Sequence, residues 1–294
     1  MVRTRAVRTV AVARSMISVI VPVRNGMPWL EQQLGALVDQ DCPEPWEVVV
    51  ADNGSTDDSP AVAQRWAGRH DRIRWIDASA RLGAPAARNA GVRAARGGLL
   101  AFCDADDVVQ AGWMAACVQA LADCDVAAGM FDFGSLNGHG TAAPMPAAMQ
   151  QFGFLPAGLS ANLAVRREAF EAVGGFCEDL LIGEDIDLCW RLQLEGYRFA
   201  LAPGAVVSKR EPSGFNEVFR KASAYGHCGP VLYRRHRPAG ARRDLSGAAK
   251  SWLWLVLQAP RLATRAGPRT AWARAAGMRS GRLAGSFKER VFFP

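Results

Sequence analysis

Hydrophobic positions in the first half of the chain form short apolar runs separated by segments with helical character. Apolar, β-branched runs without polar alternation are typical of strands buried on both faces of a sheet. Such runs lie at 17–21, 46–51, 73–76 and 99–103. Helices are predicted at 28–40, 59–68, 83–96 and 111–123. This alternation predicts βαβ units, and therefore an α/β fold with a mostly parallel sheet flanked by helices.

The pattern becomes less regular after about residue 125. Residues 138–156 are rich in Gly, Ala and Pro and predict a loop or insertion. A strand at 160–166 and a short helix at 167–173 are predicted next, and a helix at 184–195 is stopped by glycine. No internal repeat is found.

The charge of the chain is unevenly distributed along its 294 residues, of which 50% are hydrophobic. The formal net charge is +7, yet residues 209–294 hold 18 Lys and Arg against 4 Asp and Glu, and residues 1–208 hold 17 against 24. An acidic body is therefore joined to a strongly basic tail, which implies an anionic partner for the tail.

The basic tail contains the apolar run Trp252–Leu257. An apolar run among Arg and Lys residues suits the interfacial zone of an anionic membrane, and it is far shorter than the ~20 residues that span a bilayer. The alternative is a buried C-terminal helix with solvated basic residues around it. Nucleic acid is not the expected partner, because the acidic body offers no obvious groove for it.

The seven cysteines show no paired spacing, which argues against a disulfide framework and favours a reducing cytoplasm. Residues 1–15 carry four arginines and too short an apolar stretch for the core of a signal peptide. We expect them to be a disordered basic lead-in.

Acidic residues follow two of the predicted strands. Asp52 comes after the second strand, and Asp104 and Asp106 come after the fourth. In an open parallel sheet, ligands bind beyond the carboxyl ends of the strands. Carboxylates gathered at one sheet edge repel each other unless a cation lies between them, so this pattern predicts a divalent cation with a nucleotide.

The motifs taken in order resemble glycosyltransferase family 2, whose members have the Rossmann-like GT-A fold. The resemblance rests on Pro22-Val23-Arg24-Asn25, Asp52-Asn53-Gly54-Ser55-Thr56-Asp57, Gly83 with Ala87-Arg88-Asn89-Ala90-Gly91, Phe102-Cys103-Asp104-Ala105-Asp106-Asp107, residues 162–167 with Gly174-Gly175-Phe176, and Gly183-Glu184-Asp185-Ile186-Asp187-Leu188 with Arg191. It implies a GT-A domain at 16–235 and leaves 236–294 as a basic, partly apolar helical tail.

The resemblance implies a site for a nucleotide-diphosphate sugar. Its donor-binding residues would be Pro22, Val23, Asn25, Asp52, Gly54, Arg88, Asp104 and Lys209. Asp52 would accept N–H groups of the base, although an Asp that caps the turn at Gly54 is the alternative. Asp106 and Asp104 would hold Mg²⁺ or Mn²⁺ against the diphosphate. Arg88 would neutralise phosphate charge or fasten the Asp-x-Asp loop, unless it is an ordinary surface arginine.

Asp185 is the candidate general base. It would remove the proton of an acceptor hydroxyl during direct displacement, which inverts the anomeric configuration. The alternative is that Glu184 and Asp185 are simple charges at a helix N-terminus. Asp187 and Arg191 are better explained as an i,i+4 ion pair.

The sequence departs from the family pattern in the segment after that helix. Lys209 or Ser208 stands where many members carry a histidine that completes the metal shell, and a protonated lysine cannot ligate a metal. Lys209 would instead pair with donor phosphate, and His227 or His236 could substitute for the missing ligand. Asn53 replaces an acid, and Arg24 replaces the usual tyrosine.

The sequence thus predicts an inverting glycosyltransferase of cell-envelope polysaccharide or glycolipid synthesis, cytoplasmic or peripheral on the inner face of the cell membrane, with an acceptor hydroxyl on a lipid-linked or soluble molecule. The alternative is a catalytically degenerate protein of the same fold that binds nucleotide sugars or partner proteins. A sugar nucleotidyltransferase is disfavoured, because 22–28 is a poor phosphate-binding loop.

Overall fold

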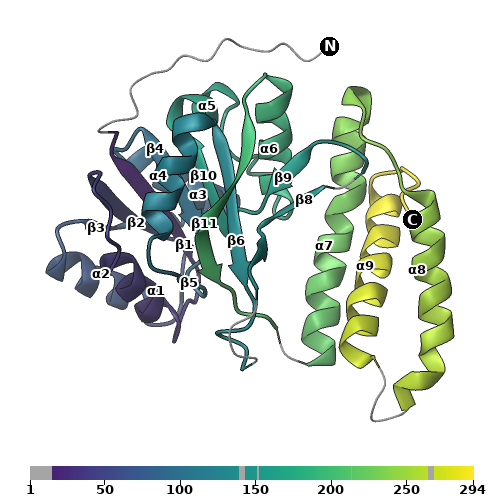
Figure 1. The fold of residues 1–294 in the computed structure, drawn as a ribbon. Helices are drawn as coiled ribbons and strands as arrows, with labels where there is room; N and C mark the ends of the chain where they lie inside the picture. Colours follow the sequence, from purple (N-terminus) through teal and green to yellow (C-terminus); the bar gives the residue numbers. More distant parts are fainter. Residues whose placement is uncertain (1–14, 139–142, 151, 213, 264–267) are drawn as a thin grey trace. The chain divides into compact units, whose positions relative to one another are not determined.

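The computed structural model describes residues 15–138, 143–150, 152–212, 214–263 and 268–294 (Figure 1). The lead-in expected at 1–15 lies, except for its last residue, outside this range. The strands are β1 (Ile17–Val23), β2 (Trp46–Asp52), β3 (Ile73–Asp77), β4 (Leu99–Cys103), β5 (Val108–Val109), β6 (Val126–Asp132), β7 (Met145–Pro146), β8 (Ala148–Gln150), β9 (Pro156–Gly158), β10 (Asn162–Arg166) and β11 (Phe199–Ser208). The helices are α1 (Leu30–Val38), α2 (Ser59–Arg69), α3 (Ala84–Ala94), α4 (Trp113–Asp123), α5 (Arg167–Ala172), α6 (Glu184–Leu194), α7 (Phe215–His236), α8 (Leu245–Gln258) and α9 (Arg269–Lys288), with the 3₁₀ turns η1 (Arg237–Ala239) and η2 (Ala259–Ala263).

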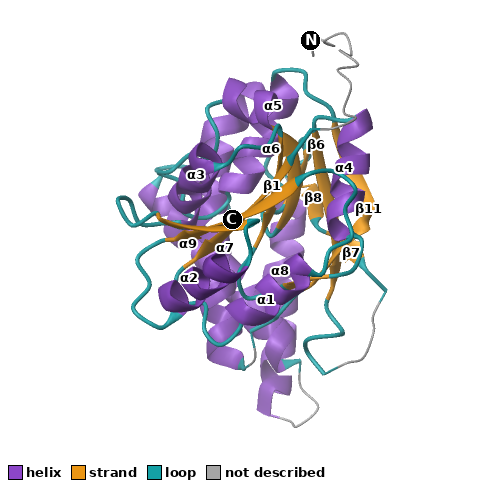
Figure 2. Cartoon of the chain, turned by 90° about the vertical axis from the view of Figure 1, so that its left-hand side faces the viewer, coloured by secondary structure: helices purple, strands orange, loops and turns teal. Residues whose placement is uncertain are grey.

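The main sheet has the strand order β3-β2-β1-β4-β10-β6-β11-β5, and β7 pairs with β6. Figure 2 shows the strands of the sheet in orange, with helix α3 on one side and helix α4 on the other. The neighbours β3, β2, β1 and β4 are parallel, and so are β6 and β11. Strand β10 is antiparallel to both β4 and β6. The expectation of a mostly parallel α/β sheet is confirmed, with β10, β5 and β7 as its antiparallel members.

Two segments are organised differently from the sequence prediction. Strand β6 was not predicted, because its sequence VAAGMFD lacks the β-branched character of the earlier strands. A Cβ at its Gly129 would lie 2.4 Å from the side chain of Asn162, so this glycine permits close approach of β10. The loop expected at 138–156 contains β7 and β8, and reaches the start of β9.

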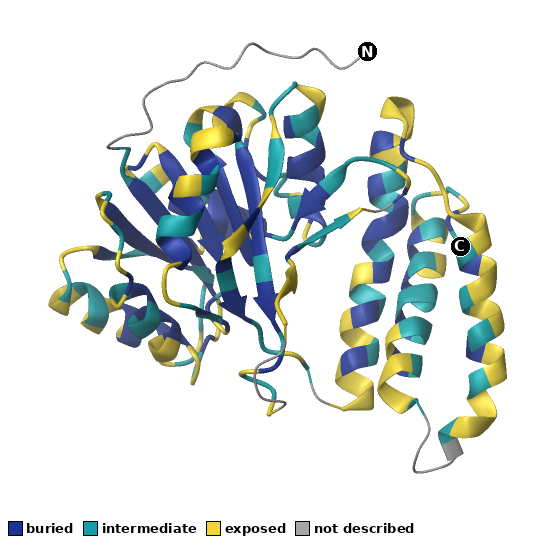
Figure 3. Ribbon diagram, in the orientation of Figure 1, coloured by how far each residue is buried: buried dark blue, intermediate teal, exposed yellow. Residues whose placement is uncertain are grey.

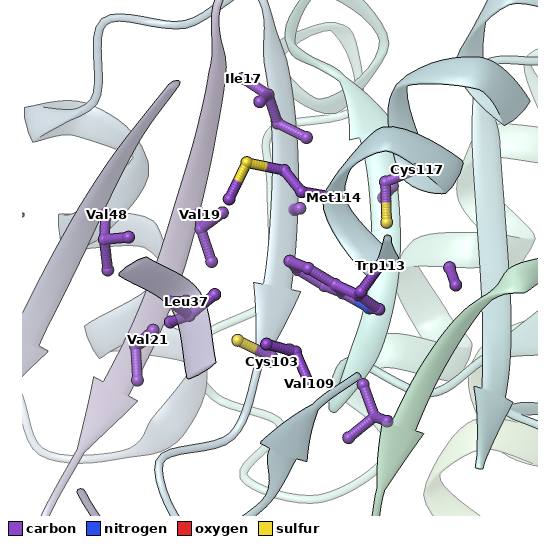
Figure 4. Close-up of a cluster of buried hydrophobic side chains, with 14 of the residues drawn as sticks. Ile17, Val19, Val21, Leu37, Val48, Cys103, Val109, Trp113, Met114 and Cys117 are labelled. Atoms are coloured by element: carbon purple, nitrogen blue, oxygen red, sulfur yellow. The ribbon is translucent and has the colours of Figure 1, made fainter. Parts of the chain in front are cut away.

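One face of the sheet packs against α1, α2 and α4. Alternate residues of β1, such as Val19 and Val21, point into this layer together with Leu37, Trp113 and Met114 (Figure 4). These side chains are fully buried, and the period of two along the strand explains why only every second residue belongs to the cluster.

The other face of the sheet is covered by α3 and α5. A Cβ on Gly91 of α3 would lie 2.5 Å from Cγ2 of Ile20, so this glycine lets the helix approach β1 closely. The ring of Phe102 packs against Phe170 and Phe176, with centroid distances of 5.8 and 5.1 Å. Gly91 therefore has a packing role within the Ala-Arg-Asn-Ala-Gly motif.

The chain divides into two compact units, residues 1–149 with 156–210 and residues 150–155 with 211–294. The first unit holds the sheet. The second contains α7, α8 and α9, so α7 groups with the C-terminal helices. The physical reason is the packing of α9 on α7, in which a Cβ on Gly277 or Gly281 would lie within 2.3 Å of a backbone oxygen of α7.

Helix α8 buries little of its own surface. Only Ala248 and Leu255 of its 14 residues are buried, and its other side is exposed (Figure 3). Within the part of the chain that the structure describes, no helix combines the length and apolar character required to cross a bilayer.

Candidate functional site

A pocket of about 540 Å³ opens at the carboxyl ends of β1 and β4. Six of the predicted site residues line it, namely Pro22, Val23, Asn25, Arg88, Asp104 and Asp106. Arg24, Trp29 and Gly83 also contribute to the wall. The other four predicted site residues do not line this pocket, namely Asp52, Gly54, Lys209 and Asp185.

The loops after β1 and β2 are joined by side-chain hydrogen bonds. Oδ1 of Asn25 accepts from the backbone N–H of Thr56 at 2.7 Å, and the N–H of Asn25 donates to Oγ of Ser55 at 2.9 Å. Asn25 has a φ of 57°, a backbone conformation that asparagine tolerates better than most residues. Asn25 therefore shapes one wall of the pocket through the 52–57 loop.

Asp52 lies at the end of β2 and is 5% exposed. Its Oδ1 accepts from the N–H of Ser55 at 3.3 Å, as in an Asp-capped turn, and Gly54 within this turn has a φ of 76°. The neighbouring Asn53 donates to the carbonyl of Ala78 and accepts from the N–H of Gly83 at 2.7 Å. An amide can both donate and accept, which an ionised carboxylate at this position could not do.

Arg88 connects three elements of the first unit. Its Nη2 lies 2.9 Å from Oδ1 of Asp104 after β4, and its Nη1 lies 2.7 Å from Oε1 of Glu184 at the start of α6. Arg88 is 4% exposed, so it is not a surface arginine. It fastens the Asp-x-Asp loop and still lines the pocket.

Asp104, Asp106 and Asp107 form a cluster whose carboxylate oxygens can lie within 4.8 Å of one another. Nζ of Lys209 contacts Oδ2 of Asp107 at 2.5 Å and Oδ2 of Asp104 at 3.4 Å. Asp106 is exposed, and its carboxylate makes no hydrogen bond or ion pair with the described residues. The carboxylate of Asp106 is therefore the part of the cluster that is open to the solvent.

The charges in the cluster shift one another's pKa. Burial raises the pKa of Asp107 to about 6, although Lys209 acts in the opposite direction. Burial would raise the pKa of Asp104 too, but the Lys209 and Arg88 cations outweigh it and lower this pKa. Burial would lower the pKa of Lys209, and Asp104 and Asp107 raise it instead, so the ammonium form persists.

Asp185 lies in the first turn of α6, beside Glu184. Its Oδ2 accepts from the N–H of Ser160 at 3.0 Å, and burial raises the pKa of Asp185. Burial and the adjacent Asp185 raise the pKa of Glu184 to about 7, against the influence of Arg88. Asp187 is fully buried and pairs with Nε of Arg191 at 2.7 Å, as its spacing indicated.

Three residues that shape the site were not singled out in the sequence. Asp107 holds Lys209, and three acids within four positions were its available signal. Glu184 pairs with Arg88, whereas the sequence suggested only a helix-end charge. Gln33 of α1 donates to the carbonyl of Asp104 and accepts from the N–H of Val109, and no motif marks it.

The donor set of the cluster suits a hard divalent cation, because carboxylate oxygens are the ligands that Mg²⁺ and Mn²⁺ prefer. Asp106 offers an unshared carboxylate, and Asp104 offers oxygens that now contact Arg88 and Lys209. Neither His227 nor His236 belongs to the same compact unit as this cluster.

Comparison with protein families gives two overlapping matches. The family described as "Glycosyl transferase family 2" matches residues 18–172, which is more than half of the chain. "Glycosyl transferase family group 2" matches residues 101–278.

Two relatives are each 29% identical to this chain. The pre-mycofactocin glycosyltransferase of Mycobacterium tuberculosis aligns over 255 residues, 82% of this chain and 53% of the relative, so this chain spans about half of that protein. The glycosyltransferase AglE of Haloferax volcanii aligns over 219 residues and 71% of each chain.

The fold is also similar to that of the mannosyltransferase PcManGT from Pyrobaculum calidifontis, solved in complex with GDP-Man and Mn²⁺. The TM-score is 0.64 at 22% sequence identity, and the alignment covers 94% of this chain and 88% of the other. This similarity confirms the GT-A architecture expected from the sequence.

Proposed function

Because this chain belongs to glycosyl transferase family 2, we propose that it transfers a sugar from a nucleoside-diphosphate sugar to a hydroxyl group, with inversion at the anomeric carbon. The observation that carries the proposal is the double contact of Arg88, which brings the pocket-lining Asp104 and the start of α6 to the same side chain. The candidate base and the candidate donor pocket are thereby connected within one unit.

The donor would occupy the 540 Å³ pocket, a size that suits a nucleotide sugar. Pro22, Val23 and Asn25 would contact the nucleoside. Oδ2 of Asp52 has no hydrogen bond to a described residue, which leaves this oxygen to accept an N–H of the base. Gly54 would hold the conformation of the loop that carries these contacts.

Asp106 and Asp104 would hold Mg²⁺ or Mn²⁺, which would supply positive charge to the diphosphate leaving group. Arg88 and Lys209 would orient the same diphosphate, since both carry N–H donors beside Asp104. The Mn²⁺ seen with the nucleotide sugar in the PcManGT complex supports a divalent ion in this fold.

Asp185 would act as the general base. The acceptor oxygen forms a bond to the anomeric carbon, the bond from that carbon to the diphosphate breaks, and the hydroxyl proton passes to the Asp185 carboxylate. Ser160 fixes the orientation of this carboxylate through its backbone N–H.

The acceptor would be a hydroxyl of a lipid-linked molecule in envelope or glycolipid synthesis, reached from the cytoplasmic face of an anionic membrane. Support comes from α8, whose exposed residues Leu253, Val256 and Leu257 are 60, 68 and 62% accessible. One relative, from Rhizobium johnstonii, is named a dodecaprenyl-phosphate galacturonate synthase, with 34% identity over 97 residues.

The proposal is tested by incubating the full chain with Mn²⁺ and a panel of UDP-, GDP- and dTDP-sugars. We expect one donor to raise the thermal midpoint and to be hydrolysed slowly without acceptor. Stabilisation with no turnover on any acceptor would favour a degenerate nucleotide-sugar-binding protein, and no stabilisation by any donor would contradict donor binding.

A further inference from the structure

A second pocket, of about 250 Å³, lies within the helical unit and has no part in the site described above. Three arginines line it, Arg243 before α8 and both Arg279 and Arg282 on α9. The remaining wall comes from Gln150, Phe152, Asp244, Gly247, Phe293 and Pro294. Its volume lies below that of ordinary small-molecule sites, which begin at roughly 300 Å³.

Arg282 is unusual among these residues because its cation is largely buried and forms no ion pair with a described residue. Its Nε is buried and unbonded, and the guanidinium makes no hydrogen bond or ion pair with any residue that the structure describes. Its Cζ lies 5.2 Å from the centre of the Phe293 ring. Burial and the nearby Arg279 lower the pKa of Arg282 to about 10.

Oxygen atoms of other residues satisfy the other two arginines in part. Nε of Arg279 donates to Oγ of Ser251 at 3.1 Å, and its Nη1 donates to the backbone oxygen of Pro294 at 2.9 Å. Nη1 of Arg243 donates to the carbonyl of Phe292 at 2.9 Å. These contacts leave further guanidinium N–H groups for a ligand.

The one acidic side chain of the pocket wall, Asp244, attracts the Arg279 and Arg282 cations without forming an ion pair with either. Asp244 accepts from the N–H of Gly247 at 2.8 Å and from Oγ of Ser246 at 3.0 Å, as the N-cap of α8. Across the described residues it forms no ion pair with the three arginines. The side chains of the pocket wall therefore include three cations against one anion, and a buried unpaired charge is costly.

We propose that Arg243, Arg279 and Arg282 form a binding site for a phosphate group. Guanidinium groups bind tetrahedral oxyanions through paired N–H donors, and a phosphate supplies the negative charge that the pocket lacks. The small volume suits a single phosphate group and excludes a nucleotide. The site is independent of glycosyl transfer.

The phosphate has two conceivable sources, a lipid headgroup and a free phosphate. The lipid source accords with α8, which begins at this pocket and exposes Trp252, Leu253 and Val256 farther along. A headgroup held by the arginines would leave its acyl chains beside an apolar helix.

The test uses thermal unfolding of the full chain in inorganic phosphate and in sodium chloride of equal ionic strength. Phosphate should raise the midpoint of the unaltered chain by about 2–4 °C at concentrations well above Kd, and this shift should be lost in Arg282→Gln and in Arg279→Gln. Arg220→Gln, an exposed arginine of α7, should keep the full shift and serves as the charge-matched control.

Without phosphate, Arg282→Gln should be at least as stable as the unaltered chain, because an unpaired charge is removed. Equal midpoints in phosphate and chloride for the unaltered chain would overturn the proposal, as would an undiminished shift in both variants. If either variant fails to fold, Arg282→Lys replaces it. This variant keeps the positive charge but lacks the paired N–H donors of a guanidinium, so its phosphate-dependent shift in midpoint should be reduced.

The source is distinguished by sedimentation with vesicles of phosphatidylcholine alone or with phosphatidic acid. Binding that requires phosphatidic acid and falls at least fivefold in Arg282→Gln would identify a lipid phosphate. If phosphate raises the thermal midpoint but Arg282→Gln leaves vesicle binding unaffected, the ligand of the site is free phosphate.

Discussion

Nη2 of Arg88 lies 2.9 Å from Oδ1 of Asp104, although the two residues belong to different layers of the first unit. Arg88 projects from α3, and Asp104 follows β4 in the sheet. The same guanidinium also contacts Glu184 at the start of α6. Three segments with wide sequence separation are therefore held at one point by a single buried cation.

Replacement of Arg88 by methionine should destabilise the fold. Asp104 and Glu184 would lose their shared partner, and loss of one member of a buried ion pair costs about 3 kcal/mol or more. Chemical denaturation measures this free energy of unfolding. Arg65→Met is the matched control, because the Arg65–Glu31 pair is about half exposed and its loss should change stability by less than about 1 kcal/mol. Equal effects of the two substitutions would contradict a structural role for Arg88.

Asp185→Asn should reduce kcat by about 10³-fold, because asparagine cannot accept the hydroxyl proton. The amide keeps the size of the side chain, so Kd for the donor should change by less than about twofold. Transfer assays and donor titration measure the two quantities separately. Asp179→Asn, at a carboxylate that is 88% exposed, should leave both unchanged. Near-normal turnover of Asp185→Asn would remove this residue from the mechanism.

The pH dependence of kcat/KM should carry the signature of the same carboxylate. A general base acts only when deprotonated, so activity should fall as the pH decreases through its pKa. Burial raises the pKa of Asp185, and burial together with Asp185 raises the pKa of Glu184 to about 7, so the acidic limb should lie above the ordinary value of about 4. The two carboxyl groups interact, and the limb therefore reports the pair. A constant kcat/KM between pH 7 and pH 4 would contradict the role of this carboxylate as general base.

Lys209→Met should increase the affinity for Mn²⁺ in the absence of donor. The ammonium of Lys209 contacts Asp104 and Asp107, and it repels a divalent cation at the same cluster. Its loss should strengthen Mn²⁺ binding by at least about tenfold. Titration followed by electron paramagnetic resonance measures free Mn²⁺ directly, with Lys221→Met as an exposed control. Donor affinity should fall in the same variant, since a phosphate contact is removed, and unchanged Mn²⁺ affinity would show that Lys209 does not oppose the metal.

The elements that local sequence determines could be predicted, and those that depend on distant partners could not. Strands β1, β2 and β4 are recognisable because each is a mainly apolar run without regular polar alternation, and Asp104 is a candidate because it directly follows such a run. Strand β6 escapes prediction since Gly129 and its alanines are acceptable only where β10 and β11 enclose them.

The site shows the same limit. Lys209 is a candidate because it stands where a histidine is expected. Its contact with Asp107 joins residues 102 positions apart, so the sequence pattern does not indicate it. Gln33 supports the Asp-x-Asp loop from 71 positions away, and its helix alone offers no sign of this. Sequence patterns indicate which chemical groups are present, and the fold determines which of these groups form ion pairs or hydrogen bonds with each other.

Helix α8 should bind the full chain to anionic membranes through its exposed side. At 100° per residue, Leu245, Ala249, Trp252, Leu253, Val256 and Leu257 fall within an arc of about 140°, which also holds Ser246 and whose centre lies about 120° from the two buried residues. The unit that contains α8 has 16 Lys and Arg against 4 Asp and Glu. A mainly apolar helix side in such a basic unit is typical of helices that lie in the headgroup region of a membrane.

Val256→Ser/Leu257→Ser should therefore weaken binding to phosphatidylglycerol vesicles by at least about tenfold, because two apolar side chains no longer leave water. Co-sedimentation measures the partition coefficient, and its decrease with salt would report the electrostatic contribution. Leu194→Ser/Leu201→Ser removes two apolar side chains of lower exposure, 39 and 44%, from the first unit and should leave partitioning unchanged. If the α8 variant partitions normally but loses a concentration-dependent dimer in light scattering, the exposed side is a contact between two copies of this chain.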